Sequence, residues 1–468
     1  MSLPDSCFMI HNSNKVVTRF APSPTGTLHV GSARTALFNF LFSKQNNGEM
    51  ILRIEDTDKE RSKKRYEKDI IESLQWLGIS HGGLFRQSER TDVYTKHIAT
   101  LIEHNNAYIA EDGVIRFKNP NKKIVFRDLV RGDIVFDTTE LKDFVIARSN
   151  IDPLYHLAVV IDDYEMGVTH VIRGEDHISN TPRQILIQEA IGAPRPAYVH
   201  IPLILSPDRS KLSTRHGAMS ITEYKKEGYL PEALINFMAL LGWSPPSAGR
   251  SLPTARRSPP SDLAEGMREK EIFTLEELVT LFSIKGVQKG GAVFNIEKLK
   301  WVNREHMKRL PEGRLKQEIE PYLPPEVKKM SESSRKAFLS VLVEKISVFS
   351  DIQNLYNAGE FSYFFEQPEY RKEELLWKDD SDFTVPQKHI DELMRILSQI
   401  STSKFTAAQI KESLWPYATE AGRGSVLWPF RYALSGKERS SDPFVIAEVL
   451  GKEETLRRLT YAQKKLSV

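Results

Sequence analysis

Cysteine is almost absent from the sequence, since Cys7 is the only one among 468 residues. One thiol forms no intramolecular disulfide and cannot supply a cysteine-rich zinc site, so we expect a reducing compartment and no metal held by protein thiolates. No run approaches the roughly 20 apolar residues of a membrane-spanning helix, so no membrane association is expected. Residues 1–14 are polar, and their first charged residue is acidic, unlike a secretory signal. They are predicted to form a disordered leader on a cytoplasmic protein.

A large excess of charge of either sign is also absent. The chain has 65 lysine and arginine residues against 62 aspartate and glutamate residues, a formal net charge of +3. This balance excludes a uniformly basic protein, so any contact with a nucleic acid must come from local clusters. The length predicts several domains, and a hydrophobic content of 40% is sufficient for their cores.

The lysine of a P-loop is missing where the pattern otherwise indicates a phosphate site. Gly26 and Gly31 have the glycine spacing of a P-loop, but Ser32 and Ala33 occupy the positions of lysine and of serine or threonine. Residues 16–20 are predicted to form a strand, and a helix is predicted to begin near Gly31. The unpaired N–H groups and partial positive charge of a helix start can bind a polyphosphate without lysine, aided here by donors from His29.

Strand and helix patterns alternate along the first part of the chain. Strands are predicted at 16–20 and 49–54, and helices at 30–44 and 62–78. A second such part begins at residue 153 with a strand, followed by a turn, another strand and a helix, and then a strand at 198–205. Residues 114–136 are predicted to form hairpins, and helical patterns dominate from about residue 272. We therefore predict an α/β protein whose Rossmann-like parallel sheet is split by a small α+β insertion and followed by an all-α C-terminal region.

Two short motifs resemble the signatures of class I aminoacyl-tRNA synthetases. Residues 29–32 (HVGS) have the form of the HIGH signature, and residues 211–215 (KLSTR) resemble the KMSKS loop that closes over ATP. Each motif alone is common by chance, but here both occur, and in the order that the class shows. Their joint occurrence supports the resemblance.

Further segments make the resemblance specific to bacterial-type glutamyl-tRNA synthetases. It extends over nearly the whole chain and includes APSPTG at 21–26, RIEDTD at 53–58, VIRGEDH at 171–177, FNIEKLKWVN at 294–303 and LGKEETLRRL at 450–459. The resemblance implies a catalytic domain at 15–92 and 159–205, and an acceptor-end-binding insertion at 93–158. It also implies a domain with the KMSKS loop and stem contacts at 206–310, and a helical anticodon-binding domain at 311–468.

The resemblance implies ATP-dependent ligation of L-glutamate to the 3′ end of tRNA(Glu) through a glutamyl-adenylate. The protein is expected to be a monomer, and Mg²⁺ is expected to enter with ATP. No covalent intermediate with the protein is needed, so catalysis depends on positioning and charge neutralisation. The expected catalytic residues are His29, Gly31 and Lys211, and those expected to complete the ATP site are Leu203, Ile204, Thr214 and Arg215.

Selection of glutamate requires cations for its side-chain carboxylate and an anion for its ammonium group. Arg19 and Arg173 lie at the ends of predicted strands, and a guanidinium binds a carboxylate through two parallel hydrogen bonds. By resemblance, Arg19, Arg173 and Tyr155 bind the γ-carboxylate, whereas Glu55 and Ser23 bind the α-amino group.

Several alternatives stay open from the sequence alone. A structural ion pair of Arg19 or Arg53 with Glu55 or Asp56 is the competing interpretation of these charges. Thr214 stands where the KMSKS loop usually has lysine, which leaves room for a non-catalytic tRNA-binding paralogue. A non-discriminating enzyme that also charges tRNA(Gln) is compatible with the sequence as well. Residues 244–262, rich in proline, serine and arginine, are predicted to form an additional mobile loop.

Overall fold

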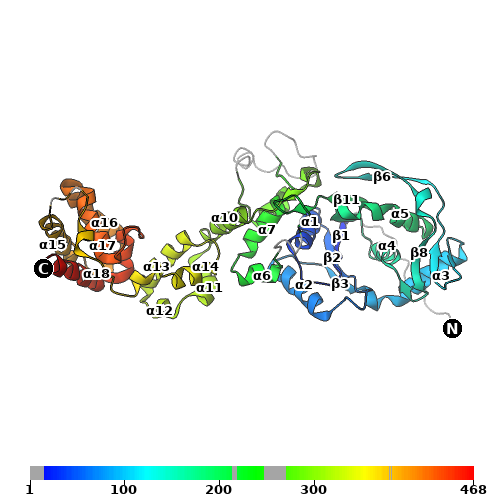
Figure 1. The fold of residues 1–468 in the computed structure, drawn as a ribbon. Coiled ribbons are helices and arrows are strands. Elements are labelled where there is room, and N and C mark those ends of the chain that lie inside the picture. Colours follow the sequence, from blue (N-terminus) through cyan, green and yellow to red (C-terminus); the bar gives the residue numbers. More distant parts are fainter. Residues whose placement is uncertain (1–14, 213–218, 247–269, 379, 381, 468) are drawn as a thin grey trace. The chain divides into compact units, whose positions relative to one another are not determined.

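The computed structural model describes residues 15–212, 219–246, 270–378, 380 and 382–467. The predicted leader and most of the predicted loop at 244–262 lie outside the described residues. The chain divides into two compact units, Met1–His306 and Met307–Val468 (Figure 1).

A parallel sheet forms the centre of the first unit. β1 (Val17–Phe20), β2 (Glu49–Ile54) and β3 (Gly83–Arg86) pair in parallel in this order. β10 (His170–Gly174) and β11 (Ala197–Ile201) form a second parallel pair. The two sets meet where Thr169 donates its backbone N–H to the carbonyl of Val17 at 2.9 Å. The prediction of a parallel sheet built from two parts of the chain is confirmed.

Helix α1 (Val30–Gln45) connects β1 to β2 and begins within one residue of the predicted start. It packs on β1, β2 and β10 and also on α7 (Pro231–Leu240), so most of its side chains are buried. α2 (Lys64–Trp76) is amphipathic instead, because it buries Ile70 and Leu74 while Lys64, Arg65, Lys68 and Glu72 are exposed.

The prediction of a strand at the start of the second α/β part is wrong. The two-residue strand β9 (Asp152–Pro153) is followed directly by helix α4 (Tyr155–Glu165), which packs on α5 (Thr181–Ala190). Residues 157–163 of α4 are all buried. A helix that is buried on all sides has no apolar periodicity, so its sequence resembles that of a buried strand.

The inserted residues form an antiparallel sheet and a separate hairpin after α3 (Thr91–Glu103). The sheet has the order β4 (Ala107–Ile109), β5 (Ile115–Phe117), β8 (Phe144–Ser149) and β9. The hairpin consists of β6 (Lys123–Asp128) and β7 (Gly132–Asp137), as the sequence predicts. The end of β6 pairs in parallel with β11, so the hairpin extends the edge of the central sheet.

The rest of the first unit lies around β12 (Ile204–Leu205) and β13 (Ala292–Val293), which pair in parallel. Its helices are α6 (Ile221–Lys226), α7, α9 (Leu275–Leu281) and α10 (Ile296–Met307). Arg34 of α1 ties this part to the sheet, because its terminal nitrogens donate to the carbonyl of Leu241 at 2.9 Å and to that of Pro202.

The described residues of the second unit contain helices and short 3₁₀ turns and no strand, as predicted. The helices are α11 (Glu312–Ile319), α12 (Pro325–Lys328), α13 (Glu332–Lys345), α14 (Asp351–Asn357), α15 (Thr384–Gln399), α16 (Ala407–Ala421), α17 (Arg423–Ser435) and α18 (Pro443–Ser467). Helices α15, α17 and α18 pack together. Gly451 interrupts α18 with φ 78° and ψ 167°, a conformation that favours glycine. Of all the helices that the structure describes, none combines the length and the apolar composition of a membrane span.

Candidate active site

The loop after β1 and the first turn of α1 form the predicted phosphate site. His29 is the N-cap of α1, and its Nδ1 accepts hydrogen bonds from the backbone N–H groups of Gly31 (3.1 Å) and Ser32 (3.4 Å). Nδ1 is therefore the unprotonated ring nitrogen, while Nε2 lies 3.1 Å from the Ser32 hydroxyl. A Cβ on Gly31 would lie 3.0 Å from Cε1 of His29, so glycine allows the ring to lie against the helix start.

The sequence predicts unpaired N–H groups at this helix start, and the structure corrects this prediction. In the structure, two of the N–H groups are already occupied by the imidazole of His29, which acts there as an acceptor and not as a donor. Only Nε2–H remains as a donor on the ring. Part of the ring reaches solvent, yet desolvation lowers the pKa of His29, and the positive charge of Lys211 lowers it further.

Lys211 lies at the base of the KMSKS-like segment. It forms an antiparallel bridge with Leu205 of β12, and its ammonium group pairs with Asp176 at 2.8 Å near the surface. Where the described chain resumes, Ser220 forms an antiparallel bridge with His29. Both flanks of the segment are thus held by backbone bridges, one of them to His29 of the predicted phosphate site. Two other residues of the predicted ATP site, Thr214 and Arg215, lie outside the described residues.

Arg19 and Glu55 belong to a buried group of alternating charges. Nε of Arg19 lies 3.2 Å from Oδ1 of Asp163, and Nη1 of Arg53 lies 2.7 Å from the same oxygen. Nη2 of Arg53 donates to Oε1 of Glu55 at 3.2 Å. Burial lowers the pKa of Arg53, but the carboxylate of Asp163 and its neighbours outweigh this effect and raise that pKa. A structural ion pair therefore exists for both arginines, and the partner of Arg19 is Asp163.

Arg173, at the end of β10, is also buried but has no carboxylate within ion-pair distance among the described residues. It is 6% exposed, and its Nε donates to Nε2 of His200 at 3.2 Å. Its Nη2 donates to the hydroxyl of Thr181 at 2.8 Å. Burial lowers the pKa of Arg173. A buried cation with only neutral partners is costly, so this guanidinium favours the binding of an anion.

Tyr155 begins α4 and completes the group. Its hydroxyl lies 3.1 Å from Nδ1 of His177, and burial lowers the pKa of His177 to about 4, so that ring is neutral at pH 7. Burial raises the pKa of Tyr155; Glu55 raises it further, whereas Arg173 and Arg19 lower it. The structure thus brings Arg19, Glu55, Tyr155 and Arg173 within electrostatic range of one another.

The remaining predicted site residues lie at the edges of this group. Ser23 is exposed in the loop after β1, and the adjacent Pro22 accepts the backbone N–H of Glu55 at 2.9 Å. Leu203 donates its backbone N–H to Oε1 of Glu175 at 2.9 Å. Ile204 is buried, so its side chain belongs to the core.

Sequence reasoning missed three buried side chains that support the site: Arg34, Asp163 and His200. Only His200 leaves a signal, because it interrupts the apolar run of β11. Arg34 lies between Ser32 and Thr35 in α1, and Asp163 follows Asp162 in α4. Nε of Arg34 has no hydrogen-bond partner among the described residues, and burial lowers the pKa of Arg34 to about 10. A single polar residue in an apolar strand, such as His200, indicates a buried hydrogen-bonding role.

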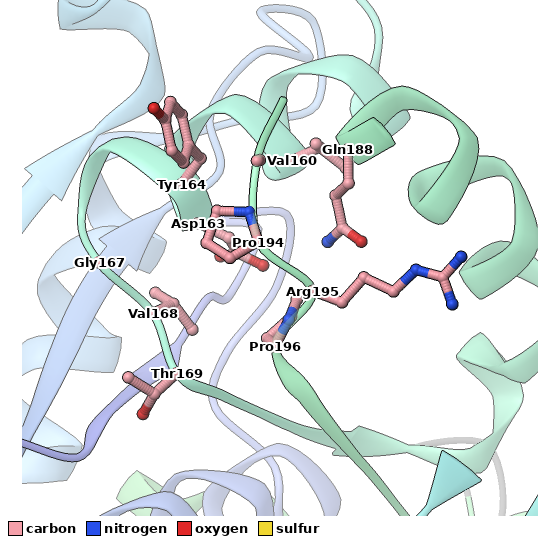
Figure 2. A pocket seen from close by; sticks show the side chains of 11 residues that line it. Val160, Asp163, Tyr164, Gly167, Val168, Thr169, Gln188, Pro194, Arg195 and Pro196 are labelled. Atoms are coloured by element: carbon pink, nitrogen blue, oxygen red, sulfur yellow. The ribbon is translucent and has the colours of Figure 1, made fainter. Parts of the chain in front are cut away.

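A separate pocket of about 190 Å³ lies at the start of β10 and before β11. Figure 2 shows Tyr164 of α4 and Gln188 of α5 among the residues that line it. None of the predicted glutamate- or ATP-binding residues lines this pocket. It meets the group around Arg173 only through Asp163, which also pairs with Arg19 and Arg53. Within the described chain, no three His, Cys, Asp or Glu side chains are grouped so that they could hold a metal ion.

Comparisons of this chain with protein-family models and with known proteins all indicate one family. The model of "tRNA synthetases class I (E and Q), catalytic domain" matches residues 15–113 and 110–301, and that of "Anticodon binding domain" matches residues 314–463. The glutamate–tRNA ligase of Aquifex aeolicus is 40% identical, with 97% of this chain and all of the relative covered. That of Thermodesulfovibrio yellowstonii is 38% identical, with coverages of 95% and 98%.

A solved structure supports the same family at the level of the fold and the sequence. It is the glutamate tRNA ligase from Elizabethkingia meningosepticum, in complex with its amino acid. The two chains superpose with a TM-score of 0.80 and 31% identity, over 97% of this chain and all of the other. This chain therefore belongs to the class I glutamate–tRNA ligase family.

Proposed function

We propose that this protein activates L-glutamate with ATP as glutamyl-adenylate and transfers it to the 3′ end of tRNA(Glu). The observation that carries the proposal is the buried guanidinium of Arg173, which lacks a carboxylate among the described residues. The relative from Elizabethkingia meningosepticum was solved in complex with its amino acid, which supports the assignment of an amino-acid site.

The charges around Arg173 match those of glutamate. Arg19 and Arg53 are balanced by Asp163 and Glu55. Asp162, which lies 3.7 Å from Nε of Arg53, is balanced by Arg90, so with Arg173 the seven charged side chains of the group sum to +1. Glutamate carries two carboxylates and one ammonium group at pH 7, a net charge of −1. Binding of glutamate would therefore neutralise the group, whereas glutamine would leave one buried positive charge uncompensated.

Each predicted residue has a chemical role in this pocket. The γ-carboxylate accepts hydrogen bonds from Arg173, Arg19 and Tyr155. Among the described residues, Nη1 and Nη2 of Arg19 have no hydrogen-bond partner, so both remain for the substrate. Glu55 and Ser23 accept from the ammonium group. Burial raises the pKa of Glu55 despite the opposing arginines, so an ammonium group beside it would favour its ionised form. If glutamine were bound, these donors would face its amide NH₂ group. This would cost about 2–5 kcal/mol of binding free energy, so the site favours glutamate.

ATP would bind between the two motifs. Nε2–H of His29 and the ammonium group of Lys211 would contact its phosphates, Gly31 would allow close approach to the backbone, and Leu203 and Ile204 would border the base. Thr214 and Arg215 are proposed to complete this site. The residues that the structure describes offer no ready metal cluster, so Mg²⁺ is proposed to arrive with ATP, and no step here depends on a protein-bound metal.

Two substitutions separate the roles of His29 as helix cap and as phosphate ligand. His29→Asn keeps a side-chain acceptor at the N-cap and removes the imidazole, whereas His29→Ala removes both. We expect both variants to slow ATP–pyrophosphate exchange about tenfold, because one hydrogen bond to a phosphate is lost. Only His29→Ala should also lower stability, by about 1 kcal/mol. Exchange assays and melting curves measure the two effects, and an equal loss of stability in both variants would contradict the capping role.

Aminoacylation of purified tRNA(Glu) and tRNA(Gln) tests the proposed function directly. We expect efficient glutamylation of tRNA(Glu) by a 53.5 kDa monomer, whose mass can be checked by light scattering. Glutamylation of both tRNAs would identify a non-discriminating enzyme. Binding of tRNA without aminoacylation or pyrophosphate exchange would contradict the proposal and leave a non-catalytic tRNA-binding protein.

A further inference from the structure

We propose that Asp128 and His200 are a positioning pair that holds the guanidinium of Arg173 in place for the carboxylate of glutamate. The pair acts through Arg173 and does not touch the substrate. This inference rests on the proposed function, in which Arg173 binds the γ-carboxylate, and adds what orients that arginine.

The three side chains form one buried chain of hydrogen bonds. Nε of Arg173 lies 3.2 Å from Nε2 of His200, and Nδ1 of His200 lies 2.7 Å from Oδ2 of Asp128. His200 and Asp128 are 0% and 1% exposed. Water is therefore unable to replace either partner, and each bond depends on the other side chains.

The direction of these hydrogen bonds fixes the tautomer of His200. A guanidinium nitrogen only donates, so Nε2 of His200 must be the unprotonated, accepting nitrogen. Nδ1 then carries the ring hydrogen and donates it to the carboxylate of Asp128. The opposite tautomer would place two N–H groups against each other and would release Arg173 from His200. A carboxylate at position 128 therefore selects the tautomer that Arg173 requires.

Asp128 is itself held so that it cannot turn away. Oδ1 accepts the backbone N–H groups of Val130 (2.9 Å) and Arg131 (2.7 Å), and Oδ2 also accepts the backbone N–H of His200 (3.0 Å). Burial raises the pKa of Asp128, but the hydrogen bond from the His200 ring, together with those from the backbone of Arg131 and Val130, outweighs burial and lowers that pKa. Burial lowers the pKa of His200, so the ring is neutral beside a charged Asp128.

The pair joins two different parts of the fold. Asp128 ends β6 of the inserted hairpin, whereas His200 lies on β11 and Arg173 on β10 of the central sheet. Arg131, in the turn of the hairpin, adds a hydrogen bond from Nε to the carbonyl of His200 at 3.3 Å. The inserted hairpin thus supplies the support for a side chain of the glutamate pocket.

A double-mutant cycle with steady-state kinetics tests this role. In Asp128→Asn, the amide NH₂ can donate to Nδ1 of His200 and favour the wrong tautomer, so we expect the KM for glutamate to rise about tenfold. The KM for ATP should change by less than about twofold, because no ATP ligand is altered. In His200→Gln, the side-chain amide oxygen can accept from Arg173 without any choice of tautomer. The KM of this variant for glutamate should therefore stay within about threefold of that of the original protein.

The decisive measurement is Asp128→Asn in the His200→Gln background. If Asp128 acts by selecting a tautomer, its replacement there should raise the KM for glutamate no further. A merely structural Asp128 would give the same increase in both backgrounds, which would overturn the proposal. His97→Gln is a matched control, since His97 forms a 2.8 Å pair with Glu165 near the surface and should leave both KM values unchanged.

Two further readouts keep the outcomes distinct. In ¹⁵N spectra of histidine-labelled protein, the His200 signals, identified by their loss in His200→Gln, should show a protonated Nδ1. A protonated Nε2 would overturn the proposal even if Asp128→Asn failed to fold. If Arg173→Ala raises the KM for glutamate and Asp128→Asn does not, only the positioning role is wrong. If Arg173→Ala leaves that KM unchanged, the assignment of the carboxylate site itself is wrong.

Discussion

Replacing Arg173 with alanine is expected to raise the KM for glutamate about 100-fold, because it removes the one arginine of the group that no carboxylate of the described protein balances. The pocket would fall from a net charge of +1 to zero, so the negative charge of glutamate would have no counterpart. The KM for ATP should change by less than about twofold, since Arg173 is assigned no contact with the nucleotide. Initial rates of tRNA aminoacylation at varied glutamate and ATP measure both constants.

Two further variants sharpen this result. Arg173→Lys keeps the charge but loses the planar fork, so we expect a KM for glutamate between those of the original protein and Arg173→Ala. Arg195→Ala removes an exposed arginine before β11 that contacts Glu189 and the carbonyl of Val125 and none of the residues assigned to glutamate. It should leave both KM values unchanged. Equal glutamate dependence in the original protein and Arg173→Ala would remove Arg173 from the pocket.

The second large effect is expected from Asp163→Asn. The carboxylate of Asp163 contacts both Arg19 and Arg53, which are 4% and 0% exposed. Its replacement leaves two buried guanidinium groups without their shared anion, so the free energy of unfolding should fall by about 3–5 kcal/mol. The KM for glutamate should also rise, because Arg19 loses the partner that orients it. Urea denaturation and aminoacylation kinetics measure the two effects.

The loss of stability in Asp163→Asn should depend on pH in a defined direction. Burial raises the pKa of Asp163, but Arg19 and Arg53 outweigh burial and lower it. A carboxyl group whose pKa is lower in the folded state stabilises the protein above its unfolded pKa, which is about 3.9. That stabilisation is lost as the pH falls through the folded-state pKa. The difference between the original protein and Asp163→Asn should therefore be constant near neutral pH and shrink only below about pH 4.

Asp112→Asn is the matched control for this experiment. Asp112 also pairs with an arginine, Arg116, at 2.8 Å, but Asp112 is 53% exposed and Arg116 is 32% exposed. Solvent and salt screen such a pair, so its removal should leave the stability almost unchanged. A similar loss in Asp112→Asn and Asp163→Asn would show that burial is not the reason for the predicted effect.

Much of the fold could be predicted because local patterns and tertiary structure agree. The strands at β1 and β2 alternate with helices α1 and α2, and the sequence places all four close to their observed positions. The error at α4 has a physical cause, since burial on all sides removes the periodicity that distinguishes a helix. The ends of helices and the boundaries of the inserted domain depend on packing, and those domain boundaries stay predictions.

The grouping of the candidate site residues was predictable where they fall in dense motifs. Arg19, Glu55 and Arg173 lie at or just after strand ends, where ligands bind in parallel sheets, and the structure brings them together with Tyr155. The partners of these residues were not predictable. Asp128 and His200 are 72 positions apart, and their contact exists only because β6 pairs with β11. No local pattern encodes such a strand pairing.

The pairing of β6 with β11 limits how far the inserted segment can be exchanged as a module. On the outer face of the hairpin, Val125 and Val135 lie opposite each other and are 56% and 64% exposed. Because these two side chains are mostly exposed, we expect their replacement to leave the support of Arg173 intact. The turn after Asp128 is different, because shortening it by even one residue would withdraw a support from the amino-acid pocket. A chimaera that keeps residues 128–131 should retain its preference for glutamate, whereas one that replaces them should lose it.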